Sequence, residues 1–226
     1  MAEEYLTDDE QLEAVKQIAV EYAPWLIGGV LVGAAVFFGI RYYQSYTNER
    51  AFKAAAQFSA MTSALQINDR AKSRQIADGL IKDYGSSPYA DQAQLTLARL
   101  DVDGGQMDKA AAPLTQVMNE SKDAELRQIA RLRLARVQIG QGKSDEAIMT
   151  LTEPMSAAFS ARYHEVRGDA YFSKKDLTDA RTEYQAALAA AAMSGINPAL
   201  LELKIQDLGA ATAPVASLDT LNKAKP

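Results

Sequence analysis

The sequence contains no cysteine and only one histidine, His164, among its 226 residues. Without cysteine it can form no disulfide, offers no thiol nucleophile and cannot build a zinc site from thiolates. No serine-hydrolase, phosphate-loop or dinucleotide motif is present either. A lone histidine with no partner of that kind is more often structural than catalytic. We therefore expect His164 to pack within the fold, and the protein to be no enzyme and to hold no cofactor or metal ion.

Net charge is also small outside the N-terminal segment. The whole chain carries −5, and residues 1–21 carry −6, because seven acids there face only Lys16. Residues 41–226 are thus close to neutral. A near-neutral domain lacks the basic surface that nucleic acid requires, so we expect no nucleic-acid partner.

Charge is completely absent from residues 22–40, which read YAPWLIGGVLVGAAVFFGI. As a helix this run is about 28 Å long, close to the thickness of the hydrocarbon layer of a bilayer. Tyr22 and Trp25 lie at one end, and Tyr42 and Tyr43 follow the other, as in an aromatic belt. The acidic leader argues against a cleaved signal peptide, and the length argues against a buried core helix. We predict one transmembrane helix in contact with membrane lipid.

Small residues recur at a spacing of four in this predicted span. Gly29 and Gly33 form one such pair, and Ala35 and Gly39 form another. Such pairs allow two transmembrane helices to approach closely. We therefore name these four residues as candidate sites of helix packing in the membrane.

The rest of the chain predicts an all-α protein, because helix-forming residues dominate and no period-two run of β-branched residues occurs. We expect an acidic leader with a short amphipathic helix over 1–21, and a repeat domain of about four helix pairs plus a capping helix over 41–208. Residues 209–226, rich in alanine and proline, are predicted to be a disordered tail.

Three segments share one pattern of small and turn residues at intervals of 37 and 33 positions. Each has a small residue where two helices would cross, then a turn residue, then an alanine early in the second helix. The three sets are Ala98, Gly105 and Ala110; Ala135, Gly142 and Ala147; and Gly168, Lys175 and Ala180. A degenerate pair, 51–66 and 71–84, precedes them. This pattern predicts a tetratricopeptide-like solenoid, in which stacking buries the apolar face of each pair.

In such a solenoid the first helix of each pair lines a concave surface that can hold a peptide or a partner helix. By repeat position we expect eight residues to face it: Leu95, Arg99, Leu132, Arg136, Arg162, Glu165, Asp169 and Phe172. Of these, we take Arg99, Arg136 and Phe172 to occupy matching positions and to contribute most to binding. The arginines of the run 131–136 are predicted to spread around their helix without forming a stripe.

Several segments together carry a family resemblance: QLEAVKQ in the leader, RYYQSY after the span, RLRLARVQIGQGKSDEAI and RGDAYFSKKDLTDA in the repeats, and NPALLELKIQDL near the end. Over residues 3–208 the chain resembles the YfgM family, the ancillary subunit of the bacterial SecYEG translocon. The resemblance implies an inner-membrane protein with a cytoplasmic N-terminus and a periplasmic repeat domain. It also implies a non-catalytic role that links the translocon to a membrane-anchored, prolyl-isomerase-like periplasmic chaperone and assists exported client proteins.

The distribution of lysine and arginine near the span favours the opposite membrane orientation. Lys16 precedes it, whereas Arg41, Arg50 and Lys53 follow it, and such residues favour the cytoplasmic side. A cytoplasm-facing tetratricopeptide adaptor that binds peptide segments is therefore an alternative. An enzyme, or a regulator of one, is an alternative of another class that no motif supports.

Overall fold

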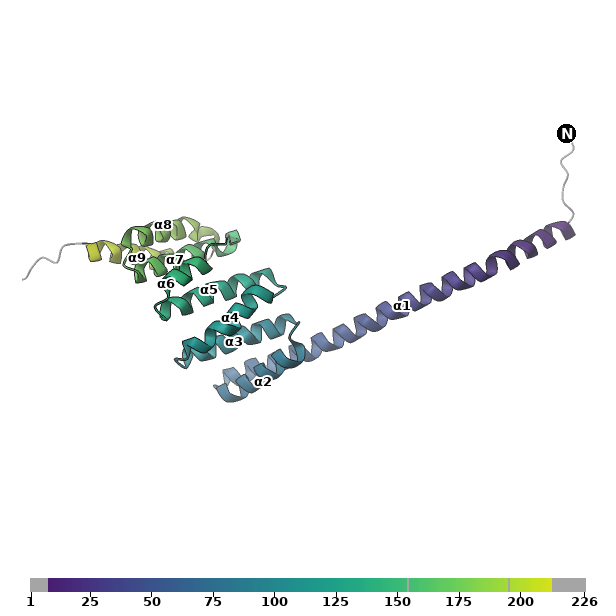
Figure 1. Cartoon of the computed structure of the whole chain (residues 1–226), viewed down its shortest axis with the longest axis horizontal. Coiled ribbons are helices and arrows are strands. Elements are labelled where there is room, and N and C mark those ends of the chain that lie inside the picture. Colours follow the sequence, from purple (N-terminus) through teal and green to yellow (C-terminus); the bar gives the residue numbers. More distant parts are fainter. Residues whose placement is uncertain (1–7, 154, 195, 213–226) are drawn as a thin grey trace, which may run out of the picture. The chain divides into compact units, whose positions relative to one another are not determined.

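The computed structural model describes residues 8–153, 155–194 and 196–212. Every regular element in these residues is a helix, which confirms the all-α prediction. The elements are α1 (Asp8–Gln66), α2 (Arg70–Tyr84), α3 (Pro88–Asp103), α4 (Met107–Glu120), α5 (Ala124–Gly140), α6 (Ser144–Thr150), η1 (Ala157–Phe159), α7 (Ser160–Ser173), α8 (Leu177–Ser194) and α9 (Pro198–Thr212) (Figure 1). The chain divides into two units, Met1–Lys53 and Ala54–Pro226.

The N-terminal unit contains most of α1, and here one prediction is wrong. The leader forms no separate short helix, because α1 runs without a break from Asp8 through the predicted span. Pro24 lies inside the helix and does not end it. A change from polar to apolar side chains alters what surrounds a helix but leaves its backbone hydrogen bonds intact. The change in side-chain polarity near residue 21 therefore predicted a helix boundary, but the helix continues through it.

The apolar part of α1 leaves its side chains uncovered within this unit. Trp25 is 81% exposed, and Leu31 and Phe38 are exposed as well. By length and composition this stretch could cross a membrane, and no other helix among the described residues could. A row of large apolar side chains in contact with water is unfavourable, so a lipid or protein environment is required to cover it.

The second unit is built from stacked helix pairs: the end of α1 with α2, then α3 with α4, α5 with α6, and α7 with α8 (Figure 1). Its apolar core consists of four clusters, and each combines one pair with the helix that follows. Leu114 of α4, for example, packs in one cluster with Ala98 of α3 and Leu134 of α5. Helix α9 completes the last cluster through Leu201 and Leu208. Each pair thus depends on its neighbour to bury its apolar face.

All four pairs share one turn, in which a single residue adopts the left-handed conformation. The φ angles are +59° at Asn68, +72° at Gly105, +76° at Gly142 and +64° at Lys175. In each turn the next residue donates its N–H to a carbonyl five positions earlier, over 2.7–3.0 Å, and the left-handed residue donates over 2.9 Å to the carbonyl three positions before it. These paired bonds form a Schellman motif, which satisfies the last carbonyls of the first helix.

The predicted repeat register is confirmed relative to these turns. Seven positions before each turn residue lies a buried residue at the helix crossing: Met61, Ala98, Ala135 and Gly168. Five positions after it lies another fully buried residue: Ser73, Ala110, Ala147 and Ala180. The degenerate first pair therefore follows the same register, with Asn68 at the turn position where the later pairs have glycine or lysine. Gly168 is required for space, because an added Cβ would lie 2.5 Å from the Tyr184 ring.

The capping helix is longer than predicted. It begins at Pro198, with the Asn197 side chain accepting the N–H of Ala199 at 3.0 Å, and continues to Thr212. Residues 209–212 are therefore helical, which corrects the start of the predicted tail. Alanine favours the helix here. The remainder of the tail, 213–226, lies outside the described residues.

Lys175 generates a prediction, because it adopts a conformation that costs an L-residue about 1 kcal/mol and that glycine adopts readily. Changing Lys175→Gly should raise the free energy of unfolding by about 0.5 kcal/mol, after the greater freedom of glycine in the unfolded chain is subtracted. Chemical denaturation of the full chain in detergent measures this. Gly142→Lys is the matched reverse change and should destabilise. A loss of stability in Lys175→Gly would show that the lysine side chain stabilises this turn.

Candidate protein-binding groove

The structure separates the predicted concave residues into buried and exposed positions. Leu95, Leu132 and Glu165 each lie ten positions before a turn residue, and all three are buried. Leu95 belongs to the core between α3 and α5, and Leu132 to the core between α5 and α7. The expectation that these two leucines face a partner is therefore wrong, since they fill the space between helix pairs.

The exposed predicted residues fall at two different repeat positions. Arg99, Arg136 and Asp169 each lie six positions before a turn residue. Phe172 lies only three positions before its turn, so its counterparts are Val102 and Ile139. Phe172 therefore does not match Arg99 and Arg136, although its side chain is exposed.

A groove lies over the core between α3, α4 and α5, with a volume of about 380 Å³. We call it the arginine groove. Its lining residues are Ala98, Arg99, Val102, Met107, Leu114, Arg133, Arg136 and Val137. The apolar residues form a floor that is continuous with the buried core, and the arginines are the only charged residues of the lining. A recess of this size and composition is typical of a site that accepts apolar side chains and fixes them with a few polar groups.

The three arginines of the groove are only weakly neutralised. Arg99 is 79% exposed in its side chain, and its nearest carboxylate, Asp103, is 3.8 Å away. The Arg133 Nη1 donates to the Leu95 carbonyl oxygen at 3.3 Å, a contact that carries no negative charge. Burial lowers the pKa of Arg133, and the positive charges of Arg99 and Arg136 lower it further. The arrangement therefore concentrates positive charge beside an apolar recess.

The groove also corrects the prediction for the arginine run on α5. Arg133 and Arg136 are one helical turn apart and line the same groove, whereas Arg131 forms an ion pair with Glu153 elsewhere. Sequence reasoning missed Arg133, Val102 and Met107. A usable signal was present, because Arg133 precedes Arg136 by three positions and shares its helix face.

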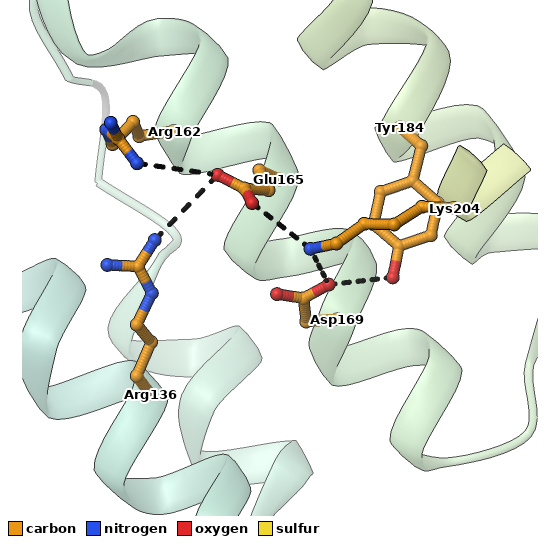
Figure 2. A network of polar contacts seen from close by, with 6 residues as sticks. All are labelled: Arg136, Arg162, Glu165, Asp169, Tyr184 and Lys204. Atoms are coloured by element: carbon orange, nitrogen blue, oxygen red, sulfur yellow. Dashed lines mark hydrogen bonds and ion pairs between the residues drawn. The ribbon is translucent and has the colours of Figure 1, made fainter. Parts of the chain in front are cut away.

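Beside the groove, Glu165 of α7 places a carboxylate at the position that is leucine in the two preceding repeats. Its side chain is only 8% exposed, and it belongs to a polar network in which three residues contact it directly (Figure 2). The Lys204 Nζ, from α9, lies 3.1 Å from Glu165 Oε1 and 2.7 Å from Asp169 Oδ1. Arg136 and Arg162 approach Glu165 Oε2 to 3.8 and 3.9 Å. A buried acid is thus met by three cations, one of which belongs to the capping helix.

Tyr184 closes this network from α8. Its hydroxyl donates to Asp169 Oδ1 at 2.8 Å (Figure 2). Burial, and then the negative charge of Asp169, raises the pKa of Tyr184 above its usual value. The phenol therefore remains a donor at all physiological pH values. Asp169, predicted for a partner surface, consequently helps to hold α7 against α8 and α9, whereas Arg162 pairs with Glu165 of its own helix.

His164 lies between α7 and α8, as expected for a structural residue. Its Nδ1 is 2.8 Å from Glu183 Oε2, and Arg167 pairs with the same carboxylate at 3.4 Å. The ring also packs edge-on against Tyr163. These contacts join the two helices of the last pair.

The predicted helix-packing residues of the span lie on the exposed apolar part of α1. A Cβ added at Gly29, Gly33 or Gly39 would have no neighbour within 4 Å. Their role in packing against another helix stays a prediction.

Stacked helix pairs with a shared left-handed turn, following an exposed apolar helix, define a tetratricopeptide-type repeat protein with a candidate membrane anchor. The model of the family described as a tetratricopeptide repeat-like domain matches residues 16–210. The Ancillary SecYEG translocon subunit of Escherichia coli (strain K12) is 31% identical over 90% of this chain and 98% of its own length. Proteins of the same name from Neisseria gonorrhoeae and Haemophilus influenzae are 27% and 26% identical, over 90% and 80% of this chain.

The chain is therefore a member of the tetratricopeptide repeat-like family, and within it of the YfgM family, as the sequence indicated. The similarity covers the apolar helix as well as the repeats.

The network around Glu165 predicts a stability effect that a double variant can separate. Lys204→Met should lower the free energy of unfolding by about 2 kcal/mol, because it leaves Glu165 and Asp169 without their nearest cation. Adding Glu165→Leu, which restores the residue type of the preceding repeats, should recover most of that loss. Denaturation midpoints of the two variants measure this. Equal midpoints for Lys204→Met and the unchanged protein would show that the ion pair contributes nothing to stability.

Proposed function

We propose that this protein is a membrane-anchored, non-catalytic ancillary subunit of the SecYEG translocon. The observation that carries the proposal is similarity along nearly the full length of proteins bearing that name, the apolar helix included. A shared anchor matters, because a subunit of a membrane channel must be held in the same bilayer as the channel. In this proposal α1 contacts membrane lipid and a helix of the translocon, and the repeat domain binds further partners.

The described residues support binding rather than chemistry. The arginine groove combines apolar and cationic side chains, and the one histidine is used in a contact between α7 and α8. Rigid first helices that present such groups can bind a partner with little ordering cost. We therefore assign the repeat domain the role of an interaction module.

The finer proposal concerns the side of the membrane and the partners. The family resemblance supports a cytoplasmic N-terminus, a periplasmic repeat domain and a membrane-anchored, prolyl-isomerase-like chaperone as partner. In that position the domain would meet exported proteins as they leave the channel. The acidic leader would stay in the cytoplasm, where its −6 charge need not cross the membrane.

A cytoplasm-facing adaptor is the second candidate. The observation that favours it is the distribution of basic residues, with Lys16 before the apolar stretch and Arg41, Arg50 and Lys53 after it. The two candidates place the same groove on opposite sides of the membrane, so orientation distinguishes them.

Orientation is tested with a reporter joined after the capping helix. The fusion point should follow Thr212, since α9 ends there and an earlier junction would cut the last core cluster. Alkaline phosphatase, which becomes active only outside the cytoplasm, should be active in this fusion. Fluorescence from a cytoplasm-only reporter at the same point, with an inactive phosphatase, would instead establish the adaptor orientation.

Association with the translocon is tested by purifying the tagged full chain from membranes in mild detergent. SecY, SecE and SecG should co-purify. Gly29→Leu with Gly33→Leu should leave insertion intact, because leucine is apolar, but reduce this yield several-fold, because the helices can no longer approach closely. Ile27→Phe with Leu31→Phe enlarges side chains on the opposite face of the helix, so it is the matched control and should not reduce the yield. No translocon subunit recovered with the unchanged protein, even after crosslinking, would contradict the proposal.

A further inference from the structure

Positive charge in the arginine groove exceeds what the neighbouring residues neutralise. Three arginines line it and no acidic residue does. Arg99 and Arg136 each have a carboxylate only at 3.8 Å, beyond hydrogen-bond distance, and Arg133 makes its polar contact with a backbone carbonyl. Their guanidinium groups therefore retain donors for a ligand, and an arginine offers five in a planar fork that suits a carboxylate.

The floor of the groove has the opposite character. Val102, Met107 and Val137 meet there above the buried Ala98 and Leu114. Water in such a recess makes few hydrogen bonds, so an apolar side chain that displaces it gains affinity. Methionine adapts its shape, which allows the recess to accept aliphatic or aromatic groups.

We infer that the arginine groove binds a segment of a partner protein in which acidic side chains flank an apolar one. The apolar side chain enters the recess, and the carboxylates pair with Arg99 and Arg136. This inference rests on the proposed function, in that the repeat domain is taken to hold protein partners, and it names the chemistry of the segment that is held.

The repeat geometry places the two exposed arginines suitably for this ligand. Arg99 and Arg136 occupy the same repeat position on α3 and α5, which are neighbouring first helices, and both line the groove. Arg133 lines the same groove, and its guanidinium donates to the Leu95 carbonyl oxygen. The recess is thus bordered by cations that rigid helices hold in place before the ligand arrives.

A protein segment fits this site better than an anionic membrane surface. A bilayer presents its phosphates in a plane and could fill a recess of about 380 Å³ only by extracting a lipid chain. A peptide supplies both the acid and the apolar group within a few residues. The groove also differs from the next repeat, where Glu165 and Asp169 already pair closely with Lys204.

The test uses the full chain in phosphatidylcholine nanodiscs, where the bilayer separates the acidic leader from the repeat domain. The probe is a fluorescent peptide with a leucine pair between two glutamates, capped at both ends. Two matched peptides replace the glutamates with glutamine or the leucines with serine. Fluorescence anisotropy should show binding of the first peptide and at least tenfold weaker binding of the other two. Raising ionic strength from about 0.01 M to about 1 M shortens the Debye length from about 30 to about 3 Å and should weaken binding.

Variants locate the binding. Arg99→Ala with Arg136→Ala should weaken binding of the acidic peptide at least about tenfold. Arg181→Ala with Lys122→Ala removes the same charge from exposed positions outside the groove and should change it little. Helical circular dichroism and melting curves must match among these proteins. If the arginine pair affects folding, Arg99→Gln with Arg136→Gln replaces it.

Several results would overturn the inference. These are no binding of the acidic peptide up to millimolar concentration, equal binding of the glutamine peptide, or equal loss in both double variants. If the arginine double variant lost only its binding to phosphatidylglycerol vesicles, the groove would be assigned to a lipid instead. If only its self-association changed, the groove would be assigned to a second copy of the chain. Recovery of SecY is measured in parallel. Peptide binding without translocon association would contradict the proposed function alone, and the converse would contradict this inference alone.

Discussion

No helix pair in the repeat domain can cover its own apolar face, and the rest of the structure depends on this constraint. Each core cluster combines a pair with the next helix along the chain, so every pair is completed by its successor. The series must then end with a helix that needs no successor. Helix α9 does so through Leu201 and Leu208, with Lys204 supplying a cation to the acidic residues of α7. Burial of apolar faces between successive pairs therefore determines both the stability of the domain and the geometry of its repeats.

The binding surface follows from this stacking. Neighbouring first helices lie side by side, and each carries one buried and one exposed residue at matching repeat positions. The buried position holds Leu95 and Leu132, while the exposed position holds Arg99 and Arg136. Where Glu165 replaces leucine, Lys204 pairs with it and with Asp169 within the fold. Where leucine remains, the arginines stay available above an apolar recess.

The turn residues and the helix crossings could be predicted from the sequence, because local steric requirements determine them. A left-handed turn needs glycine or a tolerant residue, and a close crossing needs a small one, so Gly105, Gly142 and Ala135 could be placed without a structure. The course of α1 could not, because side-chain polarity does not report backbone continuity. The groove could not be fully predicted either. Arg133 and Met107 reach it from different helices, and their meeting depends on how helices pack.

The central claim is that partner proteins meet the repeat domain at the arginine groove. The most direct measurement is photo-crosslinking in cells, with a benzophenone side chain at Val102, inside the groove, or at Arg181, on α8 outside it. We predict protein adducts from position 102 that include translocon subunits or proteins bound to them, and few from position 181. Abundant adducts from position 181 with none from position 102 would contradict it.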